Sequence, residues 1–202
     1  MTRVLRLFFA ACIVIFILAA CAAAVLLSGA YNFAADQEHI PAVASMIAKA
    51  RSASIESRAK VIQVPKLNRA EMIVAGAGNY QAMCAQCHLS PGKDKTELSA
   101  GLYPKPPDLS RVTVDPAIAF WTIKHGVKAS GMPAWGRSMP DQDIWNLVAF
   151  LKALPTLDAS AYQQLVDKSA GHSHGQMDAV GSGRTSPAVQ ENEDSRTRHR
   201  AL

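Results

Sequence analysis

The longest apolar run of the 202-residue chain lies near its N-terminus. From Leu7 to Leu27 the sequence has no charged residue, and Arg3 and Arg6 stand in front of the run. As a helix this run rises about 31 Å, enough to cross the hydrocarbon core of a bilayer. Positive charge stays on the cytoplasmic side of a membrane. We therefore expect residues 1–29 to be a single-pass anchor in the inner membrane, with the rest of the chain facing the periplasm.

Two other interpretations of this run remain open. A cleaved signal peptide would have a shorter apolar region. Residues 18–21 (L-A-A-C) also have the form of a lipobox, which would make Cys21 a lipid-modified N-terminus. Against the lipobox, the sequence stays apolar from Ala22 to Leu27, and the uncleaved anchor is favoured. Under all three interpretations, the remainder of the chain is exported from the cytoplasm.

Residues 30–67 form a connector with a predicted helix from Ala42 to Ile62. Pro41 breaks the chain before this helix, and its apolar positions form only a narrow stripe that includes Val43, Met46 and Ile47. Such a stripe is compatible with a helix lying on a membrane surface or on a partner. The simpler interpretation, which we favour, is a spacer helix.

Residues 68–156 have the pattern of a small all-α domain, since no segment alternates as a strand does. Asn68 and Glu71 have the spacing of a capping box that opens the first helix. A short helix is predicted between Asp115-Pro116 and Gly126, and a last one over 141–153. Gly76 within the first helix predicts that another helix approaches closely there, with the last helix as candidate.

The remaining residues, 157–202, are predicted to be a disordered tail, at least beyond about Leu165. They contain few large apolar side chains and many serine, glycine, histidine and charged residues. Such a composition cannot bury enough surface to order itself. The net charge of +5 is spread along the whole chain without a basic block, so a nucleic-acid partner is not expected.

The sequence C-A-Q-C-H at residues 84–88 carries the chemistry. A C-x-x-C-H run attaches a c-type haem through two thioether bonds, here from Cys84 and Cys87, and places the imidazole of His88 to ligate the iron. A redox-active dithiol would need a βαβ context, and a zinc site would need a second Cys/His pair. The other cysteines, Cys12 and Cys21, lie in the apolar leader. One covalently attached haem c is therefore predicted.

A haem that transfers electrons commonly has a second protein ligand, and methionine is the ligand that raises its potential. Met132 is favoured because Gly131 and Pro133 constrain its loop and a predicted helix separates it from His88. Met139 directly precedes the last helix and is expected to be a core side chain. His125 is the other candidate, although a histidine at a helix end more often packs or forms hydrogen bonds.

Several motifs together resemble a class I monohaem cytochrome c, of the bacterial membrane-anchored type. They are G-A-G-N-Y at 76–80, C-A-Q-C-H at 84–88, P-P-D-L at 106–109, and G-M-P-A-W-G at 131–136, followed by an aromatic terminal helix. The resemblance implies three to four helices around the haem, with His88 and Met132 as axial ligands. It also implies that the Pro107 carbonyl accepts the Nδ1 proton of His88, and that Trp121 or Trp135 borders the haem. Leu89 departs from the glycine that many members have there.

An electron carrier is the function that these features imply. Two axial ligands from the protein leave no position for a substrate, so neither catalysis nor a small-molecule substrate is expected. The anchor would keep the carrier beside redox proteins of the membrane. The alternatives are a haem sensor or gas-binding protein whose Met132 dissociates, and a haem enzyme with His125 on the distal side.

Overall fold

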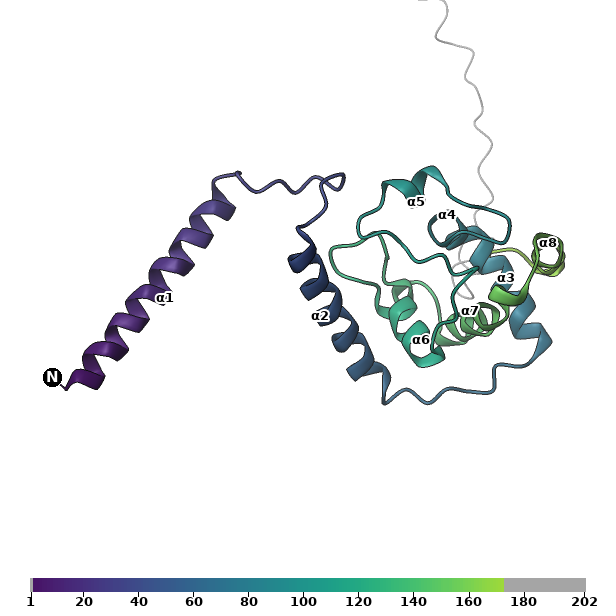
Figure 1. Ribbon diagram of the computed structural model, residues 1–202. Helices are drawn as coiled ribbons and strands as arrows, with labels where there is room; N and C mark the ends of the chain where they lie inside the picture. The colour runs from purple at the N-terminus through teal and green to yellow at the C-terminus, as the bar shows by residue number, and fades with distance from the viewer. Residues whose placement is uncertain (1, 173–202) are drawn as a thin grey trace, which may run out of the picture.

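The computed structural model describes residues 2–172. All regular secondary structure in this range is helical, as predicted. No strand occurs in this range. The elements, shown in Figure 1, are α1 (Arg3–Leu27), α2 (Pro41–Ala59), α3 (Ala70–Met83), α4 (Ala85–His88), α5 (Glu97–Gly101), α6 (Pro116–His125), the 3₁₀ turn η1 (Trp135–Arg137), α7 (Asp141–Ala153), the 3₁₀ turn η2 (Leu154–Thr156) and α8 (Ala159–Lys168).

Helix α1 stands apart from the rest of the described chain (Figure 1). None of its residues is buried, although large apolar side chains such as Phe8, Ile15 and Phe16 line its surface. It is the one helix within residues 2–172 that is long and apolar enough to cross a membrane. Exposed apolar surface of this extent calls for an apolar partner, and a bilayer is the partner that its length fits.

The centre of the globular part is the crossing of α3 and α7, which contact each other extensively. A Cβ added at Gly76 would lie 2.7 Å from the Cβ of Phe150 and closer still to the carbonyl oxygen of Asn146. Glycine therefore permits the backbones to approach, as the sequence predicted. Tyr80, Phe150 and Ile144 are fully buried around this crossing.

The capping box predicted at Asn68 is wrong. Helix α3 begins at Ala70, and its N-cap is Arg69, which makes no side-chain cap hydrogen bond. Glu71 forms an exposed ion pair with Arg69 at 3.5 Å instead of reaching back to an N-cap amide. The predicted start of α6, in contrast, is confirmed. Asp115 accepts hydrogen bonds from the amides of Ala117 (2.9 Å) and Ile118 (3.0 Å), and Gly126 ends the helix at φ +66°.

Helix α2 does not act as a free spacer, because it packs along the globular part and contacts α6. Its last residue, Ala59, is only 3% exposed, and Ala44, Ala48 and Ile55 are partly covered. Met46, from the stripe that the sequence suggested, is 65% exposed. The small alanines allow α2 to come close to the domain. Of the stripe residues, Met46 lies away from the domain, whereas Val43 is partly covered and Ile47 faces the domain.

The first part of the predicted disordered tail is in fact an ordered helix, α8. Residues 159–168 are helical and pack against α3, and Tyr162 is 4% exposed. Its hydroxyl donates to Oε1 of Gln81 at 2.6 Å. One aromatic ring with one hydrogen bond docks this segment, a contact that average composition does not reveal. The rest of the predicted disordered tail, residues 173–202, lies outside the described residues.

Candidate functional site

Residues 84–88 form a single tight turn at the end of α3. Cys84 links α3 to α4, and its carbonyl accepts hydrogen bonds from the amides of Cys87 (3.0 Å) and His88 (2.8 Å). The fully buried Tyr80 holds the exit of this turn, because its hydroxyl donates to the carbonyl of Leu89 at 2.6 Å. Two thiols and one imidazole are thereby fixed on one short piece of backbone.

The orientation of the His88 ring is set by Pro107. Nδ1 of His88 lies 2.9 Å from the carbonyl oxygen of Pro107, and since a carbonyl can only accept, Nδ1 carries the proton. The amide of Leu109 donates to the His88 carbonyl at 3.1 Å and joins the same two segments. Burial lowers the pKa of His88, which favours its neutral form. Nε2 is then left with its lone pair, the state in which imidazole binds a metal.

These groups border a cavity of about 330 Å³ whose wall is mostly apolar. Both His88 and Met132 contribute to it, and so do the two cysteines of the motif. The wall also includes Met83, Pro106, Pro107, Leu109, Val114, Ile118, Ala119, Ile123, Trp135, Leu147 and Leu151. Helices α3, α6 and α7 and the loop that precedes η1 thus surround one space.

The loop that carries Met132 is folded back on itself. The amide of Val127 donates to the Met132 carbonyl at 3.1 Å, and the Met132 amide donates to Oγ of Ser130 at 3.1 Å. The Ser130 hydroxyl in turn donates to the Val127 carbonyl at 2.8 Å. Gly126 has φ +66°, and a Cβ there would lie 2.8 Å from the Met132 carbonyl oxygen. Backbone contacts therefore define the position of Met132.

Some of the other residues predicted for the site line the cavity, and others do not. Met139 is 3% exposed within the core, as expected, and it does not line the cavity. Trp135 does line it. Trp121, the other tryptophan that the resemblance offered, borders a neighbouring cavity, and its ring lies 4.8 Å from the ring of His125 at a tilt of 37°. The cavity faces the arc of α6 that holds Ile118, Ala119, Thr122 and Ile123, and Trp121 lies outside that arc.

The two alternatives to haem find little support in this geometry. Burial raises the pKa of the Cys84 thiol to about 12, and burial also raises the pKa of Cys87. A catalytic dithiol needs a cysteine with a lowered pKa, and zinc needs thiolates. Within residues 2–172 no group of three or more His, Cys, Asp or Glu side chains is arranged to hold a metal ion.

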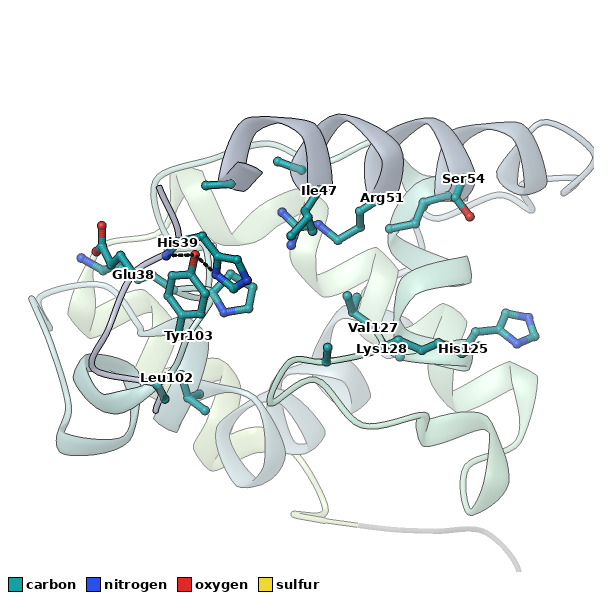
Figure 2. A pocket seen from close by; sticks show the side chains of 18 of the residues that line it. Glu38, His39, Ile47, Arg51, Ser54, Leu102, Tyr103, His125, Val127 and Lys128 are labelled. Atoms are coloured by element: carbon teal, nitrogen blue, oxygen red, sulfur yellow. Dashed lines mark hydrogen bonds between the residues drawn. The ribbon is translucent and has the colours of Figure 1, made fainter. Parts of the chain in front are cut away.

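A second, larger cavity of about 1040 Å³ adjoins the first and lies between α2 and the rest of the domain (Figure 2). At one end His39 and Tyr103 stack, and Nδ1 of His39 lies 2.9 Å from the Tyr103 hydroxyl. Arg51 extends from α2 into this space, and Lys128 borders it from the loop after α6. Arg51, Ile55 and Lys105 line both cavities.

Sequence reasoning missed the residues that reach the site from a distance. In the sequence Tyr80 stands out only as part of the motif at 76–80, and no local pattern shows that its hydroxyl meets the Leu89 carbonyl. Arg51 and Ile55 were missed because α2 was expected to be a spacer. Their spacing of four residues does place them on one face of α2, and that face was the available signal.

The donor set fits a haem. The cavity offers one imidazole with a free lone pair, one thioether and two thiols, and otherwise mostly apolar walls. An iron porphyrin needs an apolar enclosure with axial nitrogen or sulfur ligands. An all-helical fold around such a C-x-x-C-H turn defines the class of small c-type cytochromes.

The match to a family model agrees with this class. Residues 71–151 match the family described as cytochrome C oxidase, cbb3-type, subunit III, and this segment is a c-type cytochrome domain. No curated protein matches the sequence. A chain of the reducing HAO-like protein complex of Kuenenia stuttgartiensis has a TM-score of 0.39 and 20% identity to this one. That likeness covers 46% of this chain and 49% of the other, so it spans about half of each.

Proposed function

We propose that this protein is a membrane-anchored cytochrome that transfers single electrons between redox partners, through one haem c bound by Cys84 and Cys87 and ligated by His88 and Met132. The observation that carries the proposal is that His88 and Met132 border the same apolar cavity while Nδ1 of His88 is bound to Pro107 at 2.9 Å. Haem iron with two protein ligands supplies reversible one-electron chemistry.

The chain's own residues account for ligand orientation. The Pro107 carbonyl fixes the tautomer of His88 and raises the basicity of Nε2. Methionine sulfur is a weak donor that favours the reduced state, and the apolar walls act in the same direction. Tyr80 and the backbone bonds around Met132 restrain both sides of the cavity, which limits rearrangement when the charge of the iron changes.

The alternative function, a sensor or gas-binding protein, requires Met132 to leave the iron readily. The bonds from Val127 and Ser130 to Met132 argue for a ligand that stays in place. His125, the distal residue that a haem enzyme would need, does not border the cavity and packs on Trp121. Both observations support the electron carrier.

The proposed cell-membrane location is supported by α1. Arg3 and Arg6 at its start favour an N-terminus in the cytoplasm, so the cytochrome domain would face the periplasm. In that place its partners would be redox proteins in or on the same membrane. A lipid on Cys21, or removal of α1 as a signal peptide, would be revealed by the mass of the mature N-terminal peptide.

The test is haem attachment in full-length protein purified from membranes. We expect the wild type to retain haem through acid–acetone extraction, and Cys84→Ala and Cys87→Ala to lose most of it. Cys12→Ala is the matched control, because Cys12 lies in α1 and is exposed. Full retention of haem in both motif variants would contradict covalent attachment.

A further inference from the structure

The boundary between the two cavities concentrates positive charge. Arg51 from α2 and Lys105 from the segment after Tyr103 line both of them, together with Ile55, Leu102 and Val127. These two are the only lysine or arginine side chains among the described residues of the smaller cavity's wall. No carboxylate belongs to that wall.

Arg51 lacks a counter-ion within the described chain. It is partly buried, and its guanidinium makes no ion pair and no side-chain hydrogen bond within residues 2–172. Arg58, two turns along the same helix, instead donates to the carbonyl (2.9 Å) and to Oγ (2.8 Å) of Ser54. Taking a cation out of water is unfavourable unless an opposite charge meets it. Arg51, partly buried and without an ion pair, is therefore free to meet an anion at the cavity boundary, although Asp36 and Glu38 also border the larger cavity.

Helix α2 is held in place at both ends, which makes it a fixed wall. At its start the amide and Nδ1 of His39 lie 3.2 and 2.9 Å from the Tyr103 hydroxyl. At its end Ala59 is buried. Tyr103 also belongs to the segment that carries Lys105, so one contact positions α2 relative to both cations.

We propose that α2 completes the haem site from outside residues 71–151, and that Arg51 and Lys105 are the counter-ions of the two haem propionates. The inference rests on the proposed function, since it needs a haem in the smaller cavity. Haem carries two carboxylates on the edge opposite the vinyl groups, and the thiols that would bond to those vinyl groups are Cys84 and Cys87. Two cations for two carboxylates balance the charge that the cavity otherwise leaves unpaired.

The experiment compares four glutamine variants in the full-length holoprotein at one pH and one salt concentration. Arg51→Gln and Lys105→Gln remove the proposed counter-ions. Arg58→Gln and Lys128→Gln are the matched controls, since Arg58 and Lys128 line only the larger cavity. The readouts are the reduction potential and the propionate bending bands in the resonance Raman spectrum.

We expect Arg51→Gln and Lys105→Gln to shift the potential to lower values and to move the propionate bands, because loss of a nearby positive charge favours ferric haem. Arg51→Lys should restore most of the potential, and both controls should leave potential and bands unchanged. Equal shifts in Arg58→Gln and Arg51→Gln would overturn the proposal in favour of a general surface-charge effect. Unchanged propionate bands in Arg51→Gln would also overturn it, and would leave the larger cavity as the place where Arg51 meets an anion.

Two controls keep these outcomes separate from other failures. Covalent haem content and the helical circular dichroism signal show whether each variant folds. A wild type without covalent haem would defeat the proposed function itself, before any comparison of Arg51 variants. If the wild type has a normal haem spectrum and Arg51→Gln leaves the propionate bands unchanged, only the proposed role of α2 is contradicted.

Discussion

Leu89 follows the candidate axial histidine with an unusual backbone conformation. Its φ is +65° and its ψ is 178°, a region that residues with a Cβ rarely adopt. The side chain is 6% exposed, and its carbonyl accepts the hydrogen bond from Tyr80. Burial and this bond therefore hold Leu89 in a strained conformation, which explains how the turn forms without a glycine at this position.

Two substitutions at Leu89 distinguish the cost of the strained backbone from the stability gained by burying the side chain. Leu89→Ala keeps the backbone strain and loses about 2 kcal/mol of apolar burial. Leu89→Gly loses the same burial but relieves the strain, so we expect it to be more stable than Leu89→Ala by about 1 kcal/mol. Guanidinium unfolding followed by helical circular dichroism measures the difference. Equal stability of the two variants would show that the backbone at Leu89 relaxes without cost.

The methionine ligand can be assigned by two matched variants. Met132→Ala should retain covalent haem, lose the Met–iron charge-transfer band, lower the potential and allow CO to bind the reduced haem. Met139→Ala should keep the band and lose about 2–5 kcal/mol of stability, because Met139 is a core side chain. The opposite pattern, with the band lost only in Met139→Ala, would transfer the ligand to Met139.

At the scale of residues, the sequence predicted contacts made within motifs better than contacts that depend on how a helix is rotated. The spacing of C-x-x-C-H fixes one turn, and the expected bond between His88 and Pro107 is present. Whether Trp121 reaches the cavity depends on the rotation of α6 about its axis, which packing against α7 and α2 determines. No local pattern near Trp121 contains that information.

At the scale of elements, the crossing of α3 and α7 gives a direct test of close packing. Gly76→Ala would force its Cβ against the Asn146 carbonyl and Phe150, so we expect a loss of at least about 2 kcal/mol in unfolding free energy. Gly101→Ala in α5 is the control, because a Cβ there meets nothing within 4 Å. A Gly76→Ala protein as stable as Gly101→Ala would mean that the two helices can separate freely.

Helices α6 and α7 were predicted with nearly correct ends because their boundaries are marked locally. Asp115 and Gly126 delimit the first, and Asp141 begins the second. The docking of α2 and the existence of α8 were not predicted. The docking of α2 depends on small alanines that permit close approach, and α8 is held by Tyr162, which inserts between α3 and α7. Both contacts are made with segments far away in the sequence, which a local pattern does not identify.

At the scale of the whole molecule, location and haem binding should be separable. Replacing residues 1–29 by a cleavable export signal should yield a soluble protein with an unchanged haem spectrum, because the cavity residues all lie beyond α1. Its reduction by membranes should be slower at equal total concentration, since tethering raises the effective concentration of a partner. An unrelated single-pass anchor should restore the rate. Full turnover by the soluble form would show that the anchor has no part in electron delivery.

The bond between His39 and Tyr103 limits how far the cytochrome domain can move from α1. Because α2 is docked on the domain, only residues 28–38 between Leu27 and His39 can act as a tether, and fully extended they reach roughly 38 Å. In the proposed arrangement, with the domain facing the periplasm, it can therefore sweep only a shallow layer next to the membrane. A soluble oxidase or reductase far from the bilayer lies beyond its range. Under the proposed function, the cytochrome would have to meet its partners by lateral diffusion within the membrane, or remain bound to one of them.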